Sequence, residues 1–179
     1  MVTSKLNYLP AFEVVINQSL DKAIRAALQK WQFETGHTLR YWRQGYCASF
    51  ALVLAEFMGK SARLGSVLAS DGNVHHIVVV LGSLVIDARG VNTEQSLLSE
   101  INREADTHSY SLKAVRIIPF KLEHARFLKE CPEKQIGKLK ACFNVRVIHR
   151  ICRRFKAFVP GCSQAQQKDK SARFSRGES

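Results

Sequence analysis

Three side chains with complementary chemistry, Cys47, His76 and Asp87, follow one another along the sequence. A cysteine attacks as the thiolate, whereas a free thiol at neutral pH is mostly protonated. A nearby imidazole can take up the thiol proton, and a carboxylate can orient the imidazole by accepting from its other ring nitrogen. The three residue types therefore predict acyl transfer at a carbonyl carbon, with Cys47 as nucleophile, His76 as base and Asp87 as orienting group. This chemistry implies no metal and no organic cofactor.

Cys47 opens a predicted helix that ends at Gly59. One face of this helix is apolar, at Phe50, Val53, Leu54 and Phe57. The partial positive charge of a helix N-terminus favours a thiolate, and the N–H groups of the same turn can stabilise a developing oxyanion. Gly45, two residues before Cys47, leaves room for a substrate backbone. The alternative interpretation is that Cys47 is a small buried apolar residue.

His76 and Asp87 belong to a predicted β-hairpin formed by residues 74–81 and 83–90, with Gly82 and Ser83 at its turn. Opposite partners in such a hairpin have numbers that sum to about 165, so Val78 faces Asp87 and His76 lies one diagonal step away on the same face. His75 points to the other face, because side chains alternate along a strand. Only one of the two histidines can be the base, and the pattern favours His76.

The remaining pattern predicts an α+β domain followed by a basic helix. A helix begins after Ser19 as N-cap and stops at Gly36, and another helix covers residues 93–105. A strand covers residues 111–120, and a short helix covers 121–131. We expect three regions: a cysteine-enzyme domain over 1–131, a single basic amphipathic helix over 132–160, and a disordered tail over 161–179.

The charge is concentrated at the C-terminal end. Residues 1–112 hold 10 Lys and Arg against 10 Asp and Glu, whereas residues 113–179 hold 17 against 5, which accounts for the whole net charge of +12. The alternative function is therefore a non-catalytic binding module that acts through the basic helix. Its partner would be nucleic acid, an anionic membrane with Phe143, Phe155 and Phe158 inserted, or an acidic protein.

Cysteine usage and hydropathy indicate a cytoplasmic protein. The alternative is export by a route that needs no classical signal. The five cysteines form no CxxC pair, which argues against a disulfide framework and a tetrahedral zinc site. The longest apolar runs are shorter than the roughly 20 residues that cross a membrane. No apolar block with a cleavage site follows the N-terminal lysine, so no signal peptide is predicted.

The stretch GYCASFALVLAEFMGKSARL resembles the core of the transglutaminase-like branch of papain-fold cysteine enzymes. The matching positions are Gly45, Cys47, Phe50, Ala51, Gly59, Ala62, Arg63 and Leu64, followed by His76 at the head of one strand and Asp87 on the next. The resemblance covers about residues 40–92. It implies an α+β papain-like fold in which the cysteine-bearing helix packs on an antiparallel sheet that carries the histidine and the aspartate.

The same resemblance implies a thiol hydrolase or acyltransferase with a thioester intermediate and a protein or peptide amide as substrate. Such an enzyme would be a peptidase (thiol protease), a glutamine deamidase or a transglutaminase. Gln44 and Trp42 are the upstream candidates for an oxyanion or substrate contact.

Overall fold

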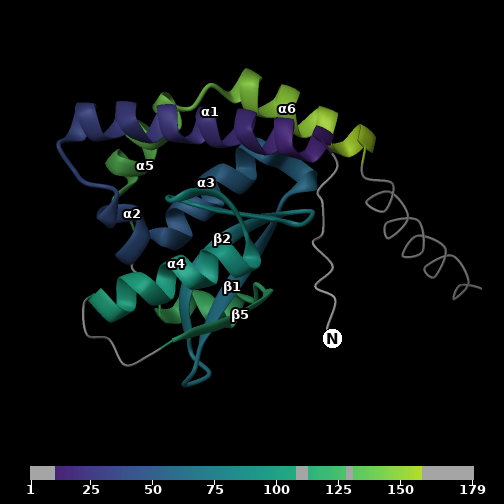
Figure 1. Ribbon diagram of the computed structural model, residues 1–179. Helices are drawn as coiled ribbons and strands as arrows, with labels where there is room; N and C mark the ends of the chain where they lie inside the picture. Colours follow the sequence, from purple (N-terminus) through teal and green to yellow (C-terminus); the bar gives the residue numbers. More distant parts are fainter. Residues whose placement is uncertain (1–10, 108–112, 128–130, 159–179) are drawn as a thin grey trace, which may run out of the picture.

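The computed structural model of the chain describes residues 11–107, 113–127 and 131–158 (Figure 1). The elements follow the order α1 (Ala11–Thr35), α2 (Arg40–Gln44), α3 (Cys47–Met58), η1 (Gly59–Ser61), β1 (Arg63–Ala69), β2 (Val74–Leu81), β3 (Leu84–Asp87), β4 (Gly90–Thr93), α4 (Glu94–Thr107), β5 (Ala114–Pro119), η2 (Leu122–Phe127), α5 (Glu133–Cys142) and α6 (Val145–Phe158).

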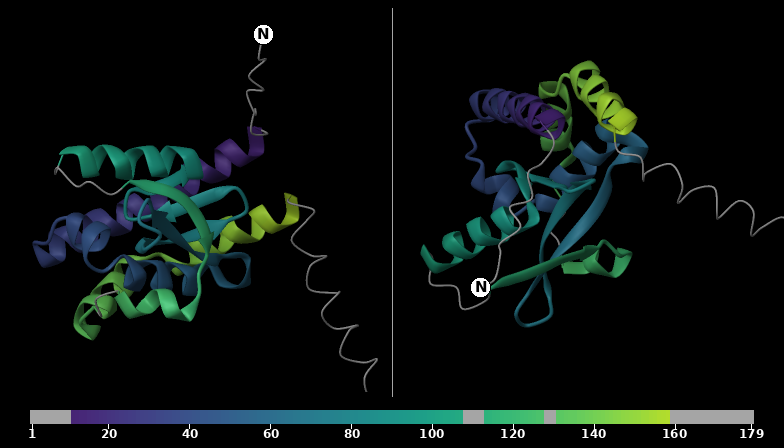
Figure 2. Two further views of the ribbon diagram at one scale, coloured as in Figure 1. Left: turned by 90° about the horizontal axis from the view of Figure 1, so that it is seen from below. Right: turned by 45° about the vertical axis from the view of Figure 1, so that its right-hand side comes forward.

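The five strands form one sheet in the order β4-β3-β2-β1-β5, and every neighbouring pair is antiparallel. Helices cover both faces: α3, backed by α1, α5 and α6, packs on one face, and α4 packs on the other (Figures 1 and 2). Strand alternation divides β2 between the two cores, with Ile77 and Val79 in the larger one under α3 and Val78 in the smaller one under α4. The α+β class with an antiparallel sheet, predicted from the sequence, is confirmed.

The predicted hairpin between β2 and β3 is confirmed, including its register. Val79 pairs with Ile86, Val80 with Val85, and Leu81 with Leu84. Gly82 adopts φ of 61° at the turn, a left-handed conformation that glycine accepts without strain. This hairpin is the central part of the sheet and carries both His76 and Asp87.

Helix α1 begins earlier than the sequence pattern indicated, so Ser19 is an exposed residue inside the helix and its expected role as N-cap is wrong. The apolar stripe of α1 extends one turn toward the N-terminus, because Ile16 is buried one turn before Leu20. The predicted stop is confirmed: Gly36 has φ of 71°, and its N–H donates to the carbonyl of Gln32.

Two strands and one helix were not predicted. Strand β1 lies between β2 and β5 although Gly65 and Ser66 interrupt its apolar pattern, and the short β4 follows the turn after Asp87. Residues 37–46, expected to be irregular, contain the one-turn helix α2. Within the predicted short helix of 121–131, residues Leu122–Phe127 form the 3₁₀ segment η2, and residues 128–130 lie outside the described residues.

The single helix expected over 132–160 is instead two helices, α5 and α6. The break has a local cause: the side chain and the carbonyl of Asn144 accept from the N–H of Val147 and so cap α6, while the Phe143 ring turns into the core beside Phe57. Because the chain changes direction at Asn144, Val147 is exposed instead of lying on the buried face of one continuous helix, and Ile148 is buried. Both helices contribute to the core that α1 and α3 share, through side chains such as Leu139.

Phe143 and Phe155 are both buried, so the expectation that they insert into lipid is wrong. The side chain of Phe158, the third phenylalanine of that expectation, lies outside the described side chains. No helix in the described ranges combines the length and the apolar character needed to cross a membrane. The tail expected to be disordered, residues 161–179, lies outside the described residues.

Candidate active site

Cys47 is the first residue of α3, directly after the N-cap residue Tyr46. The thiol is buried, and burial alone raises its pKa. The charge of His76 and a hydrogen bond with its ring act in the opposite direction, as do the backbone N–H groups of Ile77 and Ala48. These favourable contacts outweigh burial, so the pKa of the Cys47 thiol is below its ordinary value.

His76 lies near the start of β2, on the sheet face that it shares with Val78. Its Nε2 is 2.8 Å from Oδ2 of Asp87 on the neighbouring strand, and both side chains are buried. Since Nε2 is engaged by the carboxylate, Nδ1 is the ring nitrogen left for the thiol of Cys47. The three residues proposed from the sequence are therefore brought together, with the imidazole in the middle.

The charges on either side of His76 favour its protonated form. Burial lowers the pKa of the imidazole, but the Cys47 thiolate and then the Asp87 carboxylate raise it, and the pKa reaches about 9. The lowered thiol pKa and the raised imidazole pKa both favour the pair of thiolate and imidazolium over the neutral pair. Such a pair is an activated nucleophile with its proton donor already in place.

Asp87 is held as a carboxylate by Arg89, a residue that the sequence reasoning missed. The backbone N–H of Arg89 donates to Oδ1 of Asp87 at 2.7 Å, and the Arg89 guanidinium donates to Oδ2. Burial raises the pKa of the Asp87 carboxyl, but the hydrogen bond from His76 and the charges of His76 and Arg89 lower it more. The carboxylate is thereby kept charged and correctly placed to accept from the imidazole.

The Arg89 guanidinium connects this group to α4 and α2. It donates through Nη2 and Nε to the carboxylate of Glu104, which also accepts from Nη1 of Arg43 at 3.2 Å. A chain of alternating charges thus extends from Cys47 to Arg43, buried as far as Arg89 and partly exposed at Glu104 and Arg43. The sequence gives one signal for this chain of charges, the arginine two residues after Asp87. Its partners Arg43 on α2 and Glu104 on α4 follow no pattern in the sequence.

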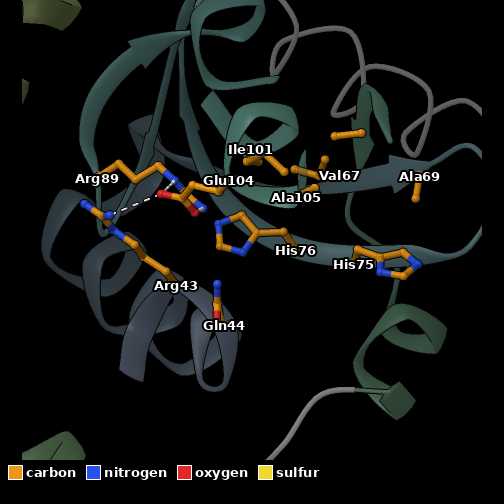
Figure 3. A pocket seen from close by; sticks show the side chains of 11 residues that line it. Arg43, Gln44, Val67, Ala69, His75, His76, Arg89, Ile101, Glu104 and Ala105 are labelled. Carbon is orange, nitrogen blue, oxygen red and sulfur yellow. Dashed lines mark hydrogen bonds and ion pairs between the residues drawn. The ribbon is translucent and has the colours of Figure 1, made fainter. Parts of the chain in front are cut away.

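A pocket of about 440 Å³ opens beside His76 (Figure 3). Its polar side is formed by Arg43, Gln44, Arg89 and Glu104, and its apolar side by Val67, Ile101 and small residues of β1, β5 and α4. Figure 3 shows His76 between these two sides, with Gln44 facing its ring. The pocket reaches the imidazole of His76, whereas Cys47 is not among the residues that line it.

The three upstream candidates lie in different surroundings. Gln44 is exposed and lines the pocket. Trp42 is fully buried among Trp31 and Phe50, so its ring does not reach the pocket. Gly45 has φ of −124° and ends α2, where an added Cβ would lie 3.2 Å from the carbonyl oxygen of Tyr41.

His75 also lines the pocket, but its side chain is largely exposed. Its Nε2 lies 3.4 Å from Oδ2 of Asp71, in the turn before β2. It therefore has a different carboxylate partner from His76 and no hydrogen bond with Asp87.

The chain matches no model of a known protein family, no curated protein and no solved structure.

Proposed function

We propose that the protein is a cysteine-dependent enzyme that transfers the acyl group of a protein or peptide amide through a thioester. The observation that carries the proposal is the buried chain of Cys47, His76 and Asp87, in which the imidazole contacts the carboxylate at 2.8 Å and lowers the pKa of the thiol. A papain-like, transglutaminase-like core is part of the same proposal. It is supported by a cysteine at the start of α3 and by its two partners on adjacent antiparallel strands.

In the proposed reaction the Cys47 thiolate attacks the carbonyl carbon of the amide. The imidazolium of His76 gives its Nδ1 proton to the departing amine as the C–N bond breaks, which leaves a thioester and a neutral imidazole. Water or an amine then attacks the thioester while His76 takes up its proton, and the thiolate and imidazolium are restored. Peptide hydrolysis, glutamine deamidation and transamidation all share this thioester and differ in the amine that leaves or in the acyl acceptor.

Two groups are available to stabilise the oxyanion. The first turn of α3 presents backbone N–H groups, including that of Ala48, which also bonds the thiolate. The side-chain carbonyl of Gln44 accepts from Nε of Arg40, so its amide nitrogen is left to donate into the pocket. We therefore assign the oxyanion contact to the start of α3, with Gln44 as its side-chain donor.

The test is the pH dependence of alkylation by iodoacetamide, resolved by site with mass spectrometry. Cys131 and Cys142 are internal controls, because at 7% and 9% exposure they are as buried as Cys47 at 5%, while their pKa values are raised. We expect Cys47 to react with an apparent pKa below about 8.5, the reference for a free thiol. The two control thiols should react only at higher pH.

Two variants assign the effect to His76. His76→Gln keeps a donor for Asp87 but cannot carry a charge, so the apparent pKa of Cys47 should rise above that of a free thiol. His75→Gln, a change at the exposed neighbouring histidine, should leave the Cys47 profile unchanged. The proposal is wrong if Cys47 titrates with the control thiols in the wild type, or if His76→Gln does not alter its profile.

A further inference from the structure

The outer side of α6 carries four exposed arginines, which we call the arginine face: Arg146, Arg150, Arg153 and Arg154. Their spacing of four, three and one residues places them on one side of the helix, over a length of about 12 Å. The sequence of α6 holds five Lys and Arg residues and no Asp or Glu. The helix therefore carries only positive charge along its length.

The side chains of the arginine face do not anchor α6 to the rest of the fold. The opposite side of α6 anchors the helix, since Ile148, Ile151 and Phe155 are buried in the core shared with α1 and α3 (Figure 1). Within the described residues none of the four arginines takes part in an ion pair, whereas Lys140 of α5 pairs with Glu56 of α3. Like charges four residues apart destabilise a helix slightly, so an anionic partner would relieve their repulsion.

The surroundings of the arginine face favour a phosphate backbone over a lipid surface. An amphipathic helix binds a membrane by burying apolar side chains between the headgroups. On α6 the described apolar side chains face the core, and the exception is Val147, which is 37% exposed. Arginine, by contrast, has a planar fork of donors that fits phosphate oxygens in a bidentate manner.

We propose that the arginine face binds the sugar–phosphate backbone of a nucleic acid without reading its sequence. This site is separate from the candidate active site. Helix α6 packs on α3 and η1 through its buried side, so the arginine face points away from α3. Cys47 opens α3 about 17 Å from the end of that helix which η1 follows. The two proposals can therefore hold or fail independently.

The test is the salt dependence of binding to labelled 20-nucleotide single strands and 20-base-pair duplexes of two unrelated sequences, followed by fluorescence anisotropy. Four phosphate contacts on duplex DNA predict a slope of about −3.6 for the logarithm of affinity against the logarithm of salt concentration. Affinity should then fall about 150-fold between 50 and 200 mM salt. The two sequences should bind equally well.

A matched pair of double variants locates the contact. Arg150→Gln with Arg154→Gln should reduce the duplex slope by about 2. Lys22→Gln with Arg116→Gln removes the same charge from exposed positions on α1 and β5 and should change the slope by much less. The proposal is overturned if both double variants behave alike. It is also overturned if vesicles of phosphatidylcholine and phosphatidylserine, or polyglutamate, are bound while nucleic acid is not.

Discussion

Arg89 is the residue on which the buried charges of the site depend, and its removal should destabilise the whole fold. Its side chain is 4% exposed, and its guanidinium contacts Asp87, which is 1% exposed, and Glu104, which is 25% exposed. Without Arg89, the single imidazolium of His76 would face two buried negative groups, Cys47 and Asp87, so that one charge is left uncompensated. Removing one partner of a buried ion pair costs roughly 3–5 kcal/mol. The partly hydrated Glu104 adds at most about 1 kcal/mol, because water screens its charge.

We therefore predict that Arg89→Met lowers the free energy of unfolding by about 4 kcal/mol at pH 7. For a chain of 179 residues this corresponds to a loss of about 10 °C in the melting temperature. The measurement is urea denaturation followed by circular dichroism. Arg25→Met is the control, because Arg25 pairs with Asp21 but is 57% exposed, and such a surface pair contributes about 1 kcal/mol or less.

The loss of unfolding free energy in Arg89→Met should also depend on pH, and it should become smaller in acid. The folded protein lowers the pKa of Asp87, so the stabilisation from its charge is fully present above the ordinary value of 3.8 and is lost as pH falls through the lowered value. In Arg89→Met the carboxyl protonates at higher pH than in the wild type. The difference in stability between the two proteins should therefore shrink in acid. A loss below about 1 kcal/mol at pH 7, or a difference that grows in acid, would refute the reasoning.

Two further predictions concern the imidazole and the hairpin turn. The ring of His76 should titrate near pH 9 in ¹⁵N NMR spectra. Its pKa should fall in Cys47→Ala, because the charge of the Cys47 thiolate is the largest contribution that raises it. An unchanged pKa of His76 in this variant would exclude the ion pair between the two side chains. Gly82→Ala should lower the free energy of unfolding by about 1–3 kcal/mol in urea denaturation, since the new Cβ would lie 2.7 Å from the Phe155 ring at positive φ. An unchanged stability would show that α6 does not pack on the turn.

The sequence by itself determined the parts of the fold that local periodicity and turn residues specify. Gly36 and Gly59 mark the ends of α1 and α3, and alternation around Gly82 gives the register of the hairpin. That register places His76 and Asp87 on one face, so the contact between them follows from residues eleven apart in the chain. A local apolar pattern likewise predicted the helix that begins at Cys47.

Tertiary structure decided what depends on partners distant in sequence. Strand β1 forms although Gly65 interrupts its pattern, because β2 and β5 supply its hydrogen bonds on both sides. The break between α5 and α6 arises because the core accepts the Phe143 ring beside α3 while Asn144 caps the next helix. The bridge from Asp87 through Arg89 joins β3 to α4 and α2, and a charge chain of this kind has no period for the sequence to reveal. Periodicity encodes which side of an element is buried, but not which charged groups meet once the elements pack.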